Sequence, residues 1–232
     1  MARSDSRSSS SARSARAVPR PAPVTPRATD DTRDRIVFAA MRLFAQKGYG
    51  STSVADILLA AEANPGSLYH FFPGKQDVLI AVLQMYLGGI QPMLLEPAWV
   101  GVDDPIERVF ALLAAYRRAL VSTNETYGCP IGSIALELHE PDEPVRKLLA
   151  ANFDGWVNAI EACFVEAGTR LPKSVDRRAL AIFALTTMEG GVMLARTERD
   201  IAPFDTSVRM LRDYVDLLTT STSSSPRRSR SR

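Results

Sequence analysis

Apolar residues recur at helical spacing along most of the chain. Acidic residues precede the stretch from residue 32 to 47 and Gly48 follows it, which are the signals of a helix start and a helix stop. Sustained alternation of apolar and polar residues, which would indicate a strand, is missing from the sequence. The pattern therefore predicts an all-α fold. The apolar residues of the first helix fall at positions i, i+3, i+4, i+7 and i+8: Ile36, Ala39, Ala40, Leu43 and Phe44.

Two short helices are predicted after the first. Ser53 precedes an apolar-faced segment over 54–61, and Asp56 stands three residues after Ser53, where it can complete a capping box. The third helix is predicted to begin at Asn64 and Pro65, because asparagine is a good N-cap and proline fits the first helical position.

The third helix has one apolar and one polar face and ends at the Pro-Gly pair 73–74. Leu68, Phe71 and Phe72 share the face that is expected to point inward. The other residues are expected to point into solvent, and they are Gly66, Ser67, Tyr69 and His70.

Longer helices are predicted in the rest of the chain. One begins at Lys75 and ends at Pro92, and the others cover 105–121, 131–138, 142–167, 174–197 and 205–219. The longest apolar stretch, 179–195, has 17 residues and contains a glutamate, so it is shorter than the ~20 residues that span a bilayer. It is predicted to be a buried helix, and no membrane partner is expected.

The first four helices follow the plan of a helix-turn-helix, in which the second of two short helices enters the DNA major groove. Gly66 lets the backbone approach DNA, while Ser67, Tyr69 and His70 can hydrogen-bond to phosphates or base edges. Lys75 adds a positive charge at a helix N-terminus, which favours a phosphate. The alternative is that this segment is an ordinary amphipathic helix of a bundle.

The residues from 32 to 79 closely resemble the DNA-binding domain of the TetR family of transcriptional regulators. Glu62 departs from the family, which usually has glycine in this turn. A residue with a Cβ tolerates positive φ poorly, and the carboxylate adds negative charge near the DNA. The residues that match the family are Ala40, Leu43, Phe44, Gly48, Ser51, Thr52, Ser53, Ile57, Ala60, Ala61, Gly66, Ser67, Leu68, Tyr69, Phe72, Lys75 and Leu79.

The resemblance implies a homodimeric regulator, most simply a repressor, that binds a palindromic double-stranded DNA operator and is released by a small, mostly apolar effector. It implies a C-terminal helical domain that binds the effector and dimerises through its last two helices. A DNA-binding regulator with no ligand is the alternative. By position, the resemblance assigns Pro65, Gly66, Ser67 and Tyr69 to the groove, His70 and Lys75 to nearby phosphates, and Ser53 to the cap of the second helix.

Residues 127–132, Tyr-Gly-Cys-Pro-Ile-Gly, and 136–138, Leu-Glu-Leu, look like a segment of the LmrA-like branch of that family. Cys129 in this segment is either a small buried apolar residue or a reactive thiol sensor. No basic residue stands near it in the sequence to lower its pKa, which favours the buried residue.

Large side chains and a few polar ones are dispersed over the central helices and fit the lining of a ligand pocket. Each of them can instead be an ordinary core residue, because aromatic residues at helical spacing usually fill volume. The candidates are Trp99, Phe110, Tyr116, Tyr127, Cys129, His139, Phe153, Trp156, Met188 and Glu189, with Asn152 as a further polar contact.

Two apolar seams in the last two helices are candidates for a dimer interface. Paired across a two-fold axis, they would form a four-helix bundle between two protomers. The alternative is that both seams face the protomer's own core. The seam residues are Ala181, Ala184, Met188, Gly191 and Ala195 in the penultimate helix and Val208, Leu211, Val215 and Leu218 in the last.

The formal net charge of +2 hides an uneven distribution. Residues 1–29 hold six arginines and one aspartate, residues 221–232 hold four arginines, and the part between holds 18 basic and 25 acidic residues. Both Ser- and Arg-rich ends are expected to be disordered, and they either solubilise the protein or add attraction to a polyanion. The predicted domains are a helix-turn-helix domain over 30–76 and a ligand-binding and dimerisation domain over 77–220.

Enzymatic chemistry has little support in the sequence. A phosphate-binding glycine loop, a nucleophile elbow and metal-ligand spacing are all missing, so no catalytic residue, metal or cofactor is expected. The alternative would be a small helical enzyme that uses Cys129 with His139. Two cysteines and no apolar leader at the N-terminus favour a reduced, cytoplasmic protein.

Overall fold

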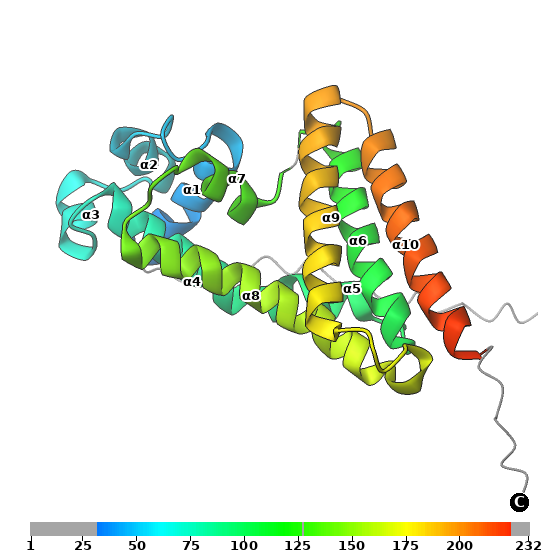
Figure 1. Ribbon diagram of the computed structural model, residues 1–232. Coiled ribbons are helices and arrows are strands. Elements are labelled where there is room, and N and C mark those ends of the chain that lie inside the picture. Colours follow the sequence, from blue (N-terminus) through cyan, green and yellow to red (C-terminus); the bar gives the residue numbers. More distant parts are fainter. Residues whose placement is uncertain (1–31, 127, 224–232) are drawn as a thin grey trace, which may run out of the picture.

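The computed structural model describes residues 32–126 and 128–223, and every element in these two ranges is helical. The all-α prediction is confirmed. Helices α1, α2 and α3 form one end of the molecule, α4 and α8 run side by side away from them, and α6, α9 and α10 stand together at the other end (Figure 1). The helices are α1 (Thr32–Lys47), α2 (Val54–Ala61), α3 (Pro65–Phe71), α4 (Lys75–Ile90), the π-helical segment η1 (Gln91–Leu95), α5 (Glu96–Trp99), α6 (Pro105–Ser122), α7 (Pro130–Glu137), α8 (Glu143–Glu166), the 3₁₀ turn η2 (Gly168–Arg170), α9 (Arg177–Glu198) and α10 (Ala202–Ser223).

Side-chain caps fix the ends of α2 and α3. The Ser53 hydroxyl accepts a hydrogen bond from the backbone N–H of Asp56, and the Asp56 carboxylate accepts one from the backbone N–H of Ser53, which completes the predicted capping box. The Asn64 side chain accepts from the N–H of Ser67, and Pro65 occupies the first turn. The starts predicted for both helices are confirmed.

The turn between α2 and α3 requires a left-handed backbone. Glu62, the residue after α2, has φ 50° and ψ 46°, and its N–H donates to the carbonyls of Leu58 and Leu59. Glycine adopts this conformation without the steric cost that a Cβ imposes. The departure at Glu62 therefore falls where the turn favours glycine.

The fourth α-helix ends at Ile90, close to the end predicted at Pro92, but the chain stays helical beyond it. The chain continues from α4 through η1 into α5. Proline lacks an N–H and its ring collides with the carbonyl four residues earlier in a regular α-helix, and a π-helical turn is one way in which a helix absorbs such an interruption. The short helix α5 was not predicted, because Pro92 read as a stop.

The core runs through both ends of the molecule along α4, α8 and α9. Helix α4 packs against α1 and α8, and α9 packs against α8 and α10. The segments Lys75–Trp99 and Arg177–Glu198 are long and apolar enough to cross a membrane by length and composition alone. Each contributes buried side chains to the shared core, as a helix inside a folded domain does.

The predictions for the Arg-rich ends lie largely outside the described residues. Residues 1–31 and 224–232 belong to that part, whereas α10 continues to Ser223. Helix α10 begins at Ala202, three residues before its predicted start.

Candidate nucleic-acid interface and ligand pocket

Helix α3 presents a largely exposed face at the end of the molecule. Pro65, Gly66 and His70 are exposed, and 57% of Tyr69 is exposed. Leu68 on the opposite side is completely buried in the core shared with α1. The predicted orientation of this helix is therefore confirmed at Leu68 and Tyr69.

Two side chains of this region differ from the predicted exposure, Ser67 by being more buried and Phe71 by being more exposed. Ser67 is half-buried, and its hydroxyl donates to the Asn64 side chain at 3.2 Å. Phe71, predicted to point inward, is 37% exposed and meets the His70 ring edge-to-face at 4.8 Å between centroids. It is the last residue of α3.

The Lys75 ammonium is engaged within the protein. It donates to the carbonyls of Tyr49 at 3.0 Å and Thr52 at 3.1 Å, and it lies 4.2 Å from the centroid of the Tyr49 ring. These contacts hold the loop between α1 and α2 against the start of α4. The contact of Lys75 with a DNA phosphate stays a prediction.

The last residue of α7, Glu137, is hydrogen-bonded to the same loop. The Glu137 carboxylate accepts hydrogen bonds from the backbone N–H groups of Tyr49 at 2.7 Å and Gly50 at 2.5 Å. A side chain on Gly48 or Gly50 would collide with this carboxylate, and Gly48 has φ 85°. We call this set, Glu137 with residues 48–50, the Glu137 clamp. The sequence contains Glu137 in a segment that resembles the family, but nothing in it indicated these partners.

An apolar cavity of about 160 Å³ lies between α1, α4, α6, α7 and α8. Tyr116 and Trp156 line it with ring centroids 5.4 Å apart, and burial raises the pKa of Tyr86 beside them to about 12. Asn152 donates to the carbonyls of Leu83 and Leu148, so its amide ties α8 to α4. The structure thus brings Tyr116, Asn152 and Trp156 together.

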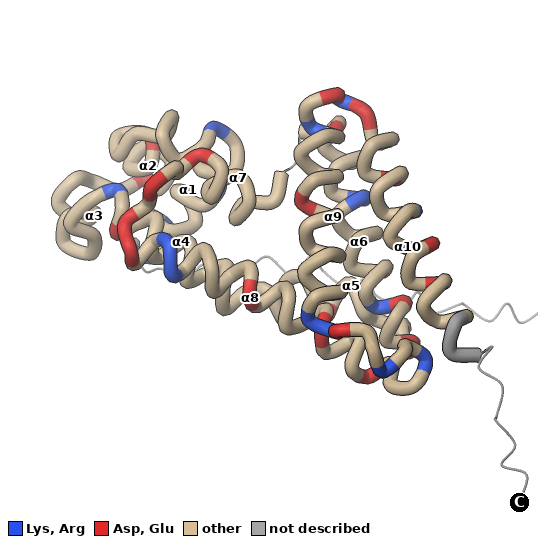
Figure 2. The backbone as a smooth tube through the Cα atoms, viewed as in Figure 1, with Lys and Arg blue, Asp and Glu red and all other residues tan. Residues whose placement is uncertain are grey.

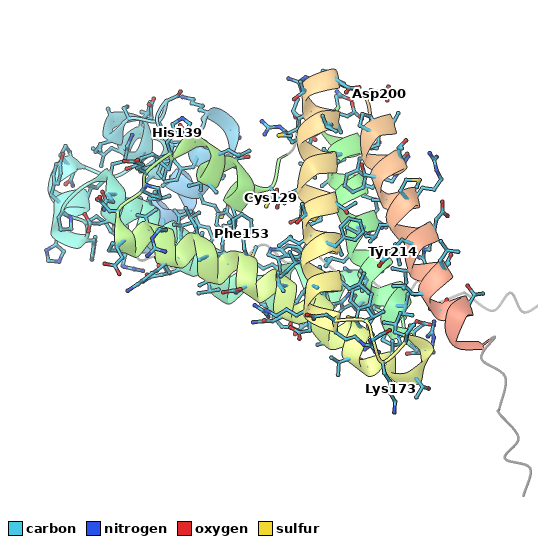
Figure 3. All side chains as sticks on the ribbon, viewed as in Figure 1. Cys129, His139, Phe153, Lys173, Asp200 and Tyr214 are labelled. Atoms are coloured by element: carbon cyan, nitrogen blue, oxygen red, sulfur yellow. The ribbon has the colours of Figure 1, made fainter. Side chains whose placement is uncertain are left out.

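A larger groove of about 840 Å³ lies between α1, α7, α8 and α9. It is lined by three predicted residues, Cys129, Phe153 and Glu189. Figure 3 labels Cys129 and Phe153, which lie in the region between α7 and α9. Arg196 also lines it and was not predicted, because it stands near the end of α9 among other exposed charges.

Cys129 lines both spaces and forms the wall between them. Its sulfur accepts the N–H of Gly132 at 3.5 Å and so caps α7. Burial, with the Glu189 carboxylate as a second cause, raises the pKa of the Cys129 thiol to about 12. The thiol therefore stays protonated at neutral pH, which favours the buried residue over the reactive sensor.

Four predicted pocket residues lie outside both spaces. The Trp99 indole N–H donates a hydrogen bond to the Arg108 carbonyl at 2.9 Å. Phe110 is buried, and the guanidinium carbon of Arg212 lies 3.3 Å from the centroid of the Phe110 ring. Met188 is buried in the protein interior. His139 is exposed in the loop after α7, close to the α1–α3 end (Figure 3).

Two further predictions concern Tyr127 and the pair of Cys129 with His139. Tyr127 lies outside the described residues. Cys129 is buried while His139 is exposed, so the structure gives no support to a catalytic pair of these two residues. Among the described residues, no group of three potential metal ligands comes together.

The residues of the predicted dimer seams face the interior of the protomer, which is the alternative stated for them above. Gly191 packs against Phe204 where α9 meets α10, and a Cβ there would crowd the Phe204 ring. Val208 and Leu218 are partly buried against the same core. The other seam residues are buried in the single chain: Ala181, Ala184, Met188, Ala195, Leu211 and Val215.

Large apolar side chains instead cover the opposite faces of α9 and α10. Phe183 and Tyr214 meet edge-to-face on this surface with centroids 5.9 Å apart. Along α9 the backbone carries long uncharged stretches between its charged positions (Figure 2). We define the outer face by its exposed residues Ile182, Phe183, Met193, Leu194, Met210, Tyr214 and Leu217.

Comparison with known proteins gives two matches to family models. Residues 36–82 match the model for bacterial regulatory proteins of the tetR family, and residues 105–210 match the LmrA/YxaF-like C-terminal domain of transcriptional regulators. The chain is 32% identical over 188 residues to an uncharacterised HTH-type transcriptional regulator of Mycobacterium tuberculosis, covering 79% of this chain and 93% of that protein.

Two other relatives are similar over most of their length. The HTH-type transcriptional repressor DhaR of Mycobacterium sp. GP1 is 29% identical, with 75% of this chain and 86% of the repressor covered. The crystal structure of a regulatory protein TetR from Rhodobacter sphaeroides superposes with a TM-score of 0.71 at 25% identity, covering 79% of this chain and 98% of that one.

Proposed function

The chain belongs to the TetR family of DNA-binding transcriptional regulators, with an LmrA/YxaF-like C-terminal domain, and from this membership we propose that it is a repressor. It would bind a palindromic operator as a homodimer in the cytoplasm and leave the operator when a small molecule binds. The family is not enzymatic, as the sequence predicts. The repressor DhaR among its relatives supports repression as the direction of control.

The exposed face of α3 is the observation that carries this proposal. Gly66 leaves the backbone open to close approach, and Tyr69 projects a ring and a hydroxyl beside it. A hydroxyl at this place can hydrogen-bond to a phosphate or a base edge in the major groove. The six arginines of residues 1–29 precede α1 in the chain and would add attraction that does not depend on DNA sequence.

The outer face supports a dimer. A contiguous apolar surface on two long antiparallel helices suits a four-helix bundle across a two-fold axis. The same axis would set two copies of α3 about one DNA turn apart, ~34 Å. The division into a DNA-binding domain over 30–76 and an effector-binding and dimerisation domain over 77–220 belongs to this proposal.

Two helices support coupling between effector and DNA. Helix α4 begins at Lys75, next to the α1–α2 loop, and its other end lines the apolar cavity with Gly89 and Ile90. Helix α7 begins at the groove and ends in the Glu137 clamp. An effector that shifts either helix would move α3 relative to its copy in the partner and lower the affinity for the operator.

The test is retardation of a DNA duplex that spans the region upstream of the protein's own gene. Tyr69→Ala should abolish retardation, because it removes the exposed ring and hydroxyl of α3, while helicity measured by circular dichroism stays unchanged. Val100→Ala, which trims a still more exposed apolar side chain just after α5, is the control and should bind like the wild type. Wild-type affinity in Tyr69→Ala would contradict the role of α3.

A further inference from the structure

Glu189 places a carboxyl group in the groove without a full set of partners. Its Oε1 atom is buried and has no hydrogen-bond partner in the part of the chain that the structure describes. Glu189 projects from α9 against Gly132, where any Cβ would collide with its other oxygen. The carboxyl group of Glu189 therefore packs against Gly132 of α7, and its Oε1 atom can still accept a hydrogen bond.

The surroundings of Glu189 offer little compensation for a negative charge. Burial raises the pKa of its carboxyl, and a hydrogen bond with the Cys129 thiol opposes this only in part. The positive groups that line the groove each have another partner. Lys47 pairs with Asp56, Arg196 lies 3.4 Å from the Ser133 hydroxyl, and Arg199 approaches the carbonyl of Glu125.

The groove also offers apolar surface, although Thr186 and Ser133 contribute hydroxyl groups to its lining. Phe153 from α8 and Val192 and Met193 from α9 line it. A buried carboxylate without a cation is costly, and a cation that enters with an apolar body would satisfy both the charge and these walls. A neutral donor would satisfy the oxygen but would not balance the charge.

We propose that the groove between α7 and α9 is the effector site and that Glu189 binds there the ammonium group of a small organic cation with an apolar body. This inference rests on the proposed function only in calling the bound molecule an effector. The binding itself does not depend on it.

Three probes that share an apolar body and differ only in the head group test the proposal. They are 4-phenylbutylamine, 4-phenylbutanol and 4-phenylbutyrate, added to the full-length protein at millimolar concentration. The amine should raise the midpoint temperature of unfolding and bind roughly tenfold more tightly than the alcohol, since it alone brings a charge-assisted hydrogen bond. The carboxylate should give no shift.

Glu189→Gln keeps the size of the side chain and removes its charge. Calorimetric titration should show that this variant binds the amine roughly tenfold more weakly, until amine and alcohol bind alike. Glu198→Gln makes the same change at an exposed position on the same helix and should leave amine binding unchanged.

Three outcomes would overturn the proposal: no shift with the amine, equal or tighter binding of the alcohol, or full amine binding in Glu189→Gln. Operator retardation by the wild type is measured separately. If the wild type fails to bind any operator while the amine still binds through Glu189, then the proposed function fails and the cation site stands.

Discussion

Glu62 holds a conformation that its own side chain disfavours. The left-handed backbone at φ 50° lets its N–H reach the carbonyls that end α2. For an L-residue with a Cβ this conformation raises the free energy of the folded state by about 1–2 kcal/mol. Glycine avoids most of this strain but loses more conformational entropy on folding. The turn between the two short helices is therefore built with a residual strain.

Glu62→Gly should raise the free energy of unfolding by about 0.5–1 kcal/mol, because the relief of strain exceeds the added entropy cost. Urea unfolding followed by circular dichroism measures the change. Glu62→Ala is the control, since it removes the carboxylate but keeps the Cβ. A gain of the same size in Glu62→Ala would show that charge rather than backbone geometry sets the stability of this turn.

Local chemistry made the caps predictable. Ser53, Asn64 and Pro65 act on backbone groups within a few residues, so their effect can be inferred from a short stretch of sequence. Lys75 was placed correctly at the start of a helix, but its ammonium finds carbonyls more than twenty residues away in the chain. Such distant partners leave no periodic signal.

At the scale of elements, α7 joins two parts of the molecule. Its first turn carries Cys129 and Gly132 against the groove, and its last residue is Glu137 in the clamp. Since α7 has only eight residues, a displacement at one end must reach the other. It is a second mechanical path beside α4.

Glu137→Gln should weaken the clamp, because a neutral amide accepts the two N–H groups less strongly than a carboxylate does. We expect the free energy of unfolding to fall by about 1 kcal/mol. This is a small effect for hydrogen bonds to a charged group, because the two bonds are exposed to solvent. Chemical denaturation measures the loss. Glu140→Gln, an exposed neighbour outside the clamp, should change nothing. An unchanged stability in Glu137→Gln would mean that the clamp does not hold the loop.

Helices that are apolar on several sides limited the prediction at this scale. In α9 the small residues Ala181, Ala184 and Gly191 and the large residues Phe183 and Leu194 both repeat at helical spacing. The small ones are inside because α9 and α10 approach closely, as Gly191 against Phe204 shows. Periodicity alone cannot tell which of two apolar faces packs within the chain and which remains exposed.

At the scale of the whole molecule, the outer face should hold two protomers together. Phe183→Glu combined with Leu217→Glu places two charges on this face and should yield monomers in sedimentation velocity. The monomer should also lose operator affinity, because it can no longer bind both half-sites of the operator at once. Val100→Glu with Val165→Glu adds the same charges at exposed apolar positions elsewhere and should remain a dimer. A dimer in the first variant would place the interface on another surface.

Met193 belongs both to the groove and to the outer face. If two copies meet through that face, each partner borders the mouth of the other's groove. Occupancy of the groove and self-association then become linked equilibria, in which each changes the constant of the other by the same factor. The effector concentration needed for half-saturation would thus depend on the concentration of the protein in the cell. Effector titrations at several protein concentrations would measure this dependence.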